Sequence, residues 1–83
     1  MAYSIPFTDI ANKGSITIED KSINTDTSLQ LIGRNLADYG SSLNTNFLKT
    51  LENFANANPP SNPIEGQLWY DTTSGIDQLK IYD

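Results

Sequence analysis

Cysteine and histidine are both missing from this chain of 83 residues. Without cysteine, no disulfide can stabilise the fold and no thiol can act as a nucleophile. Without histidine, the side chain most often used as a general acid or base is absent. Carboxylates remain, but the neighbours Glu19 and Asp20 would point to opposite faces of a strand. We therefore expect neither an enzyme nor a bound cofactor.

Basic residues and long apolar runs are also scarce. Five Lys and Arg face ten Asp and Glu, which gives a net charge of −5. Nucleic acids and anionic membranes favour basic patches, so neither is expected as a partner. No run approaches the ~20 apolar residues that span a bilayer, and the N-terminus lacks the basic and apolar regions of a signal peptide. We expect a soluble protein that is made in a cytoplasm and not exported by an N-terminal signal.

The apolar fraction is low as well, at 37%, against about 45–50% for typical domains in a count that includes glycine. A chain of this length forms one small domain, which buries only about 60% of its unfolded surface. Asn, Ser and Thr are abundant, as in chains that become ordered against partners. We therefore predict a small, extended fold that is completed by oligomerisation.

The last third of the chain predicts a β-hairpin over 67–82. The runs Gln67–Asp71 and Gln78–Tyr82 are rich in aromatic and β-branched residues, and the loop 72–77 between them has turn chemistry. Because side chains alternate between faces, each strand carries apolar groups on both of its faces. In the first strand Leu68 and Tyr70 lie on the face opposite to that of Trp69, and in the second strand Leu79 and Ile81 lie on the face opposite to that of Tyr82. A lone hairpin is at best marginally stable in water. This hairpin therefore needs cover that it cannot supply itself.

One helix is predicted over 41–57. Ser41 or Ser42 can cap its start, and Asn58 followed by two prolines ends it. An apolar stripe recurs at spacings of four, four and three residues: Leu43, Phe47, Leu51 and Phe54. This stripe packs either onto the chain's own strands or against other chains in a bundle. It sustains barely two heptads, so spacing alone does not establish a coiled coil.

The first forty residues are predicted as an extended arm with short strands. Tyr3, Ile5 and Phe7 share one side, and Pro6 restricts their segment to an edge or an arm. Short strands are predicted over 15–19 and 28–32, with a turn at 12–14 and a loop over 20–27. The domain organisation is then an arm over 1–40, a helix over 41–57, a Pro-rich linker over 58–66 and a hairpin over 67–83. The fold class is α+β.

Two sets of residues resemble the fibre and appendage proteins of tailed bacteriophages. The first is Pro63-x-x-Gly66-x-Leu68-Trp69-Tyr70-Asp71-Thr72-Thr73-x-Gly75, ending in Leu79-Lys80-Ile81-Tyr82-Asp83. The second lies upstream: Leu31-x-Gly33-Arg34-Asn35, then Tyr39-Gly40 and Leu51-Glu52-Asn53-Phe54-Ala55. Together they cover 29–83. The chain departs from the family in having Ile76 and Asp77 before the return strand and no glycine after Asp83. The resemblance suggests an N-terminal piece of a longer protein.

The resemblance implies a structural protein of the virion, assembled in the host cytoplasm. The chain would be the N-terminal anchor of a trimeric fibre, which it attaches to the tail, baseplate or neck. Docking to these partners is predicted for four residues: Tyr3, Ile5, Phe7 and Arg34, the arm adding a strand to a sheet edge and Arg34 entering a carboxylate or carbonyl pocket. The trimer interface is predicted to contain Leu43, Phe47, Leu51, Phe54, Trp69 and Tyr70.

Three other functions are less well supported by the residues. Trp69, Tyr70 and Tyr82 could stack on sugars in a receptor- or glycan-binding module, although aromatic residues also serve strand packing. Asn24-x-Asp26-x-Ser28 begins like a calcium loop, but its twelfth position is Asn35 rather than the required Glu, so no metal site is expected. Nothing in these residues supports an enzyme such as a depolymerase.

Overall fold

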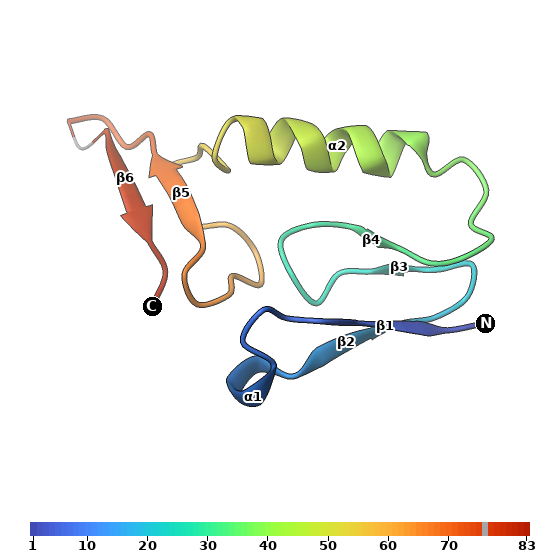
Figure 1. Cartoon of the computed structure of the whole chain (residues 1–83). Helices are drawn as coiled ribbons and strands as arrows, with labels where there is room; N and C mark the ends of the chain where they lie inside the picture. The colour runs from blue at the N-terminus through green and yellow to red at the C-terminus, as the bar shows by residue number, and fades with distance from the viewer. Residues whose placement is uncertain (76) are drawn as a thin grey trace.

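The structure, a computed structural model, describes residues 1–75 and 77–83 (Figure 1). Its elements are β1 (Tyr3–Pro6), α1 (Ile10–Lys13), β2 (Ser15–Ile18), β3 (Ile23–Asn24), β4 (Leu31–Ile32), α2 (Gly40–Leu51), β5 (Leu68–Asp71) and β6 (Gln78–Ile81). Within these residues the strands form separate antiparallel pairs, β1–β2, β3–β4 and β5–β6. The α+β class is confirmed. Ile76, in the predicted loop 72–77, lies outside the described residues.

The N-terminal arm folds back on itself. In the β1–β2 pair, Tyr3 lies opposite Ile18 and Pro6 lies opposite Ser15, so the proline falls at the end of the ladder. The predicted turn at 12–14 is instead the end of the one-turn helix α1, closed by Gly14 with φ of 74°. Ile18 is the only fully buried large apolar side chain among the described residues. The arm is therefore a hairpin.

The second strand pair differs from the prediction. Of the strand expected over 28–32, only Leu31 and Ile32 pair, and their partner is β3, within the segment 20–27 that was predicted as loop. The backbone of Gln30 bonds to a side chain of α2 instead of to a strand. This explains why the short apolar alternation at 28–32 yields only a two-residue strand.

Helix α2 starts one residue earlier and ends six residues earlier than predicted. Neither serine caps it: the N-cap is Tyr39, and Ser42 lies buried inside the helix. At the other end Phe54 N donates to Lys49 O and Asn53 N donates to Thr50 O, the two bonds of a Schellman motif. Asn53 adopts the left-handed conformation, with φ of 54°, which Asn tolerates better than most residues. The helix thus ends at Leu51, with Asn53 just beyond its C-cap Glu52 and well before the prolines.

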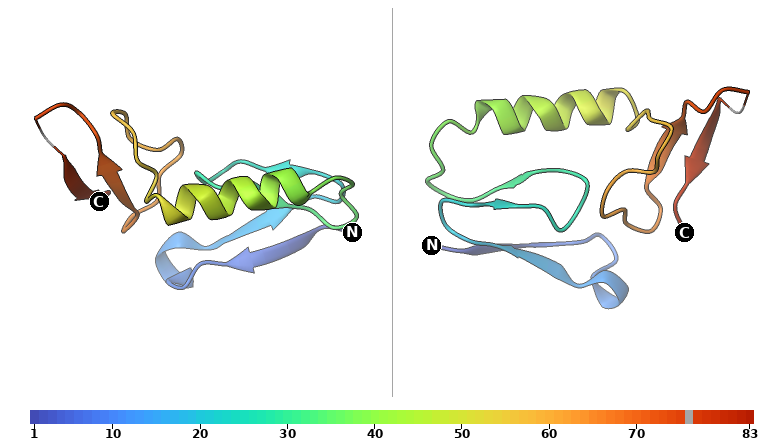
Figure 2. Two further views of the ribbon diagram at one scale, coloured as in Figure 1. Left: turned by 90° about the horizontal axis from the view of Figure 1, so that it is seen from above. Right: turned by 180° about the vertical axis from the view of Figure 1, so that it is seen from behind.

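The hairpin β5–β6 forms as predicted, with Leu68 opposite Ile81 and Asp71 opposite Gln78. The segment that follows α2 covers the other edge of β5: Tyr70 N donates to Asn53 O, Asn56 N to Tyr70 O, and Thr72 N to Asn56 O. Figure 2 shows the hairpin beyond the C-terminal end of α2 in both views. Helix and hairpin are therefore joined by backbone hydrogen bonds.

The molecule is a thin slab of 47 × 33 × 15 Å. Its radius of gyration is 14.3 Å, whereas a compact domain of this length has about 12 Å. Its accessible surface is 5746 Å² for 9.2 kDa, whereas a typical folded monomer of that mass exposes about 4,900 Å². The chain thus exposes roughly 800 Å² more than a typical monomer.

Candidate protein-interaction surfaces

Helix α2 turns its polar side towards its own chain. Asn46 exchanges two hydrogen bonds with the backbone of Gln30, of 2.8 and 2.7 Å. Lys49 Nζ donates to the carbonyl oxygen of Ser28 at 3.4 Å. Ser42 is the one buried residue of the helix, and Thr45 is half-buried on the same side. The hydrogen bonds between α2 and the β3–β4 region therefore come from the Asn46 amide and the Lys49 ammonium group.

The apolar side of α2 faces solvent. The exposed fraction is 37% for Leu43, 63% for Phe47, 64% for Leu48 and 79% for Leu51. The sequence left two packing modes open for this stripe. In this arrangement the stripe does not pack onto the chain's own strands. Phe54, predicted in the same stripe, lies beyond the helix end and is half-buried. An amphipathic helix normally buries its apolar face; this one leaves it uncovered.

The two faces of the β5–β6 hairpin have different surroundings. Trp69 and Lys80 are half-buried on one face, where Asp71 is buried with 6% of its surface exposed. Trp69 Nε1 is buried and finds no hydrogen-bond acceptor among the described residues. The opposite face is exposed and carries Leu68, Tyr70, Leu79 and Ile81. Trp69 and Tyr70, both predicted at the trimer interface, therefore lie on opposite faces.

An ion pair fixes the inner face of the hairpin. Lys80 Nζ lies 2.6 Å from Asp71 Oδ2, and Thr73 N donates to Asp71 Oδ1 at 2.9 Å. The hydrogen bond from Lys80, followed by those from Thr73, lowers the pKa of Asp71 to about 2. The ionised carboxylate is therefore part of the folded hairpin.

Acid should loosen this hairpin. Because the folded pKa of Asp71, about 2, lies below the unfolded value of about 3.9, the ionised carboxylate stabilises the fold above about pH 4, and this contribution is lost as the pH falls towards 2. The pKa of Asp20 is also lowered, mainly by the N-terminal ammonium group, so other residues contribute in the same window. Urea unfolding followed by Trp69 fluorescence should show a smaller decline between pH 4.5 and 2 for Asp71→Asn than for the wild type. Equal declines would contradict the role of Asp71.

The predicted docking residues of the arm separate into two groups. Tyr3 Oη donates to Ile32 O at 2.5 Å, and the Arg34 guanidinium lies over the Tyr3 ring, 5.2 Å from its centroid. These two residues therefore contact each other and their own chain. Ile5 is 42% exposed and Phe7 is half-buried. Both border an open, apolar hollow of about 200 Å³, whose other lining residues are Pro6, Ile16, Thr27, Leu29, Leu31 and Ile64.

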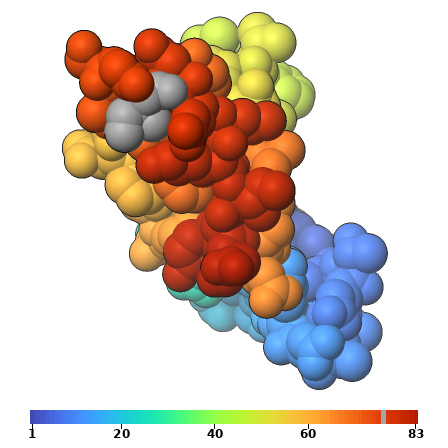
Figure 3. Space-filling view, turned by 90° about the vertical axis from the view of Figure 1, so that its left-hand side faces the viewer, coloured from blue at the N-terminus to red at the C-terminus, as the bar shows by residue number. Residues whose placement is uncertain are grey.

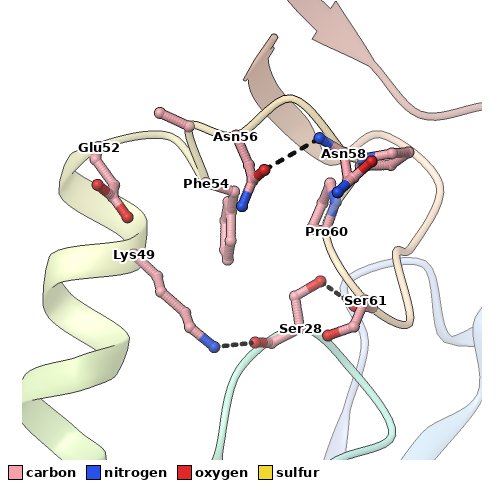
Figure 4. Close-up of a pocket in the computed structure, with 10 residues that line it drawn as sticks. Ser28, Lys49, Glu52, Phe54, Asn56, Asn58, Pro60 and Ser61 are labelled. Carbon is pink, nitrogen blue, oxygen red and sulfur yellow. Dashed lines mark hydrogen bonds between the residues drawn. The ribbon is translucent and has the colours of Figure 1, made fainter. Parts of the chain in front are cut away.

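A polar hollow of about 200 Å³ lies between the end of α2 and the Pro-rich linker (Figure 4). Its polar groups largely bond to one another: Ser28 Oγ donates to Ser61 O, and Asn58 N donates to Asn56 Oδ1. Small-molecule sites usually enclose about 300–1,000 Å³ with free polar groups aimed inwards. The hydrogen bond from Ser28 to Ser61 instead holds the Pro-rich linker against the β3–β4 loop.

Neither a metal-binding cluster nor a membrane-spanning helix is found in the described part of the chain. There, no group of three or more carboxylates could hold a metal ion. At the calcium-loop-like segment, Asn24 Nδ2 donates to Asp26 Oδ2 and Asp26 N donates to Asn24 Oδ1, which makes a local turn. Among the same residues, neither helix has the length and apolar character that crossing a lipid bilayer requires.

Comparison with known protein families, curated proteins and solved structures found no match for this chain. Function is therefore inferred from the surfaces themselves, together with the resemblance in sequence. The sequence pattern located the stripe on α2 and Tyr70 on the hairpin. It did not select Leu68, Leu79 and Ile81, although their alternation placed them on one face with Tyr70. The strand register, which pairs Leu68 with Ile81 and Tyr70 with Leu79, is the signal that places these four residues on one face.

Proposed function

We propose that the chain is the N-terminal anchor of a trimeric fibre of a tailed bacteriophage and acts as a structural protein of the virion. The observation that carries this proposal is the orientation of α2, whose polar side meets its own chain while Phe47 and Leu51 are exposed. Such a helix is stabilised by a partner that covers its apolar side. Three copies that bring these sides together would do so without any chemical reaction.

The surface area supports a multichain state. The roughly 800 Å² by which the chain exceeds a typical monomer matches the area that each partner buries in a standard protein interface, about 800 Å². Among the described residues, Ile18 is the only fully buried large apolar side chain. One copy therefore cannot enclose a substantial core, whereas neighbouring copies can supply the missing layer.

Attachment to the tail, baseplate or neck is proposed to use the exposed side of the arm. Ile5 and Phe7 border the apolar hollow, whose mostly apolar lining suits an apolar side chain of a partner. Tyr3 and Arg34 instead hold the arm against the β4 region through the hydrogen bond to Ile32 and the stacked guanidinium. In this proposal they position the arm, and Ile5 with Phe7 makes the contact. No observation favours the glycan-binding alternative, because Trp69 is on the inner face of the hairpin.

The proposal is tested in phage particles from cells that produce a tagged copy of the full chain. We expect the wild-type chain to co-purify with particles and to be labelled by antibody at the base of a fibre. Ile5→Lys places a charge beside the hollow and should reduce incorporation at least about tenfold while the oligomer persists. Ser4→Lys adds the same charge on the other face of β1 and should incorporate normally. Absence of the wild-type chain from particles would overturn the proposal.

A further inference from the structure

The outer face of the β5–β6 hairpin is a continuous apolar surface. Two cross-strand pairs form it, Leu68 with Ile81 and Tyr70 with Leu79, and all four side chains are 36–66% exposed. Tyr82 N donates to Gln67 O, whereas Tyr70 N donates outside the hairpin to Asn53. By alternation, both pairs are of the non-hydrogen-bonded kind, in which side chains approach most closely. The four residues therefore act as one patch, called here the outer hairpin face.

The outer hairpin face carries no charge, although 18% of the residues in the chain are charged. The charged residues of the two strands, Asp71 and Lys80, lie on the inner face and pair with each other. Strand β6 is also open at its far edge, because among the described residues it pairs only with β5. Figure 3 views the molecule from the hairpin side, where residues of β6 cover the centre of the surface. The face is accessible.

We propose that the outer hairpin faces of neighbouring copies pack against one another around the axis of the oligomer. This inference rests on the proposed trimeric anchor and names the surface that its hairpins use. Residues next to a rotation axis meet their own copies, so a charge there would face an identical charge. An uncharged, apolar face in an acidic chain fits a second copy of itself for this reason.

Within residues 1–75 and 77–83, no element of the chain covers this face. The segment 53–56 occupies the far edge of β5 through three backbone hydrogen bonds, and the inner face already holds the buried Asp71. An exposed apolar strand with an open edge is prone to pair with strands of other molecules and to aggregate unless it is covered. Packing of three hairpins would cover the four apolar side chains of each copy. Trp69 then contacts only its own chain. Of the two aromatic residues of the hairpin that were predicted at the interface, Tyr70 is the one that contacts a neighbouring chain.

Single cysteines test this arrangement directly, because the natural chain has none. Ile81→Cys and Leu79→Cys place a thiol on the outer hairpin face. Gln78→Cys is the matched control, since Gln78 is also exposed on β6 but shares the face of Asp71. A disulfide requires the two Cβ atoms to approach within about 4.5 Å. Under mild oxidation we expect interchain disulfides at position 81 or 79 to form at least about tenfold faster than at position 78.

Two further measurements separate the possible outcomes. Sedimentation reports the oligomer for each variant before oxidation, and Trp69 fluorescence reports whether the inner face remains intact. If the chain is trimeric and all three thiols react at the rate of the Gln78→Cys control, the hairpin inference is overturned while the trimeric anchor stands. If the wild-type chain sediments as a monomer at every concentration, both are overturned. Fast cross-linking at 79 or 81 in a trimer supports both.

Ile81→Lys provides a second test that does not depend on oxidation. The substitution reduces the net negative charge, so any dissociation cannot come from greater overall repulsion between chains. We expect at least about a tenfold weaker association for Ile81→Lys than for Gln78→Lys, which adds the same charge on the inner side of the strand. Equal association of the two variants would overturn the inference.

Discussion

Phe47→Lys should convert the proposed trimer into monomers without unfolding the helix. Phe47 is 63% exposed in the single chain, so a lysine there disturbs little within one copy. Burying that exposed part in a bundle contributes about 1–2 kcal/mol per chain, hence about 3–6 kcal/mol for three chains. We expect the association constant of the trimer to fall at least about a hundredfold, as measured by analytical ultracentrifugation.

Ser41→Lys is the matched control for this prediction. Ser41 is exposed in the first turn of the same helix, and its side chain lies about 120° from Phe47 and about 80° from Leu51 around the helix axis. We expect its association to match the wild type. Circular dichroism should give the same helix content for both variants. A Phe47→Lys chain that remains trimeric would show that α2 does not gather the copies.

Among the substitutions whose effect does not depend on association between chains, Gly33→Ala should cause the largest loss of folding stability. A Cβ atom at position 33 would lie 2.1 Å from Glu19 O, 2.9 Å from Ser22 O and 3.0 Å from Ser22 N. All three are backbone atoms, so no side chain can rotate out of the way. We expect a loss of about 3 kcal/mol in the free energy of unfolding, measured by urea titration. In so small a domain, such a loss should leave a sizeable unfolded fraction.

The structure gives a reason for this close approach. Gly33 N donates to Ser22 O and Lys21 N donates to Arg34 O, so the two chain segments are drawn together at Gly33. Gly40→Ala is the control, because a Cβ there meets nothing within 4 Å. Gly40 is the first residue of α2, and alanine favours helix over glycine by up to about 1 kcal/mol. Equal stability of the two alanine variants would contradict the close approach of the Glu19 and Ser22 backbone to Gly33.

The sequence was sufficient to predict the elements whose signals are local. The hairpin followed from two aromatic and β-branched runs around a polar loop, and its observed pairs begin at Leu68 and end at Ile81. The apolar stripe of α2 followed from helical spacing. Both signals arise from alternation within a few residues, which does not depend on the rest of the chain.

The remaining features depend on contacts distant in sequence. Periodicity shows that Phe47 and Leu51 share a face, but it cannot show whether that face meets the same chain or another one. The strand at Ile23–Asn24 exists because Leu31–Ile32 returns beside it. The early end of α2 at Leu51 was missed because the prolines after Asn58 gave a stronger stop signal than the single Asn53 that follows the helix.

The three backbone bonds between the segment 53–56 and β5 have a mechanical consequence. They act side by side, so a lateral pull on the hairpin loads them together instead of opening them one after another. The helix and the hairpin should consequently tilt as one lever, with little bending at the joint. A force applied to the hairpin would then be transmitted along α2 towards the opposite end of the molecule.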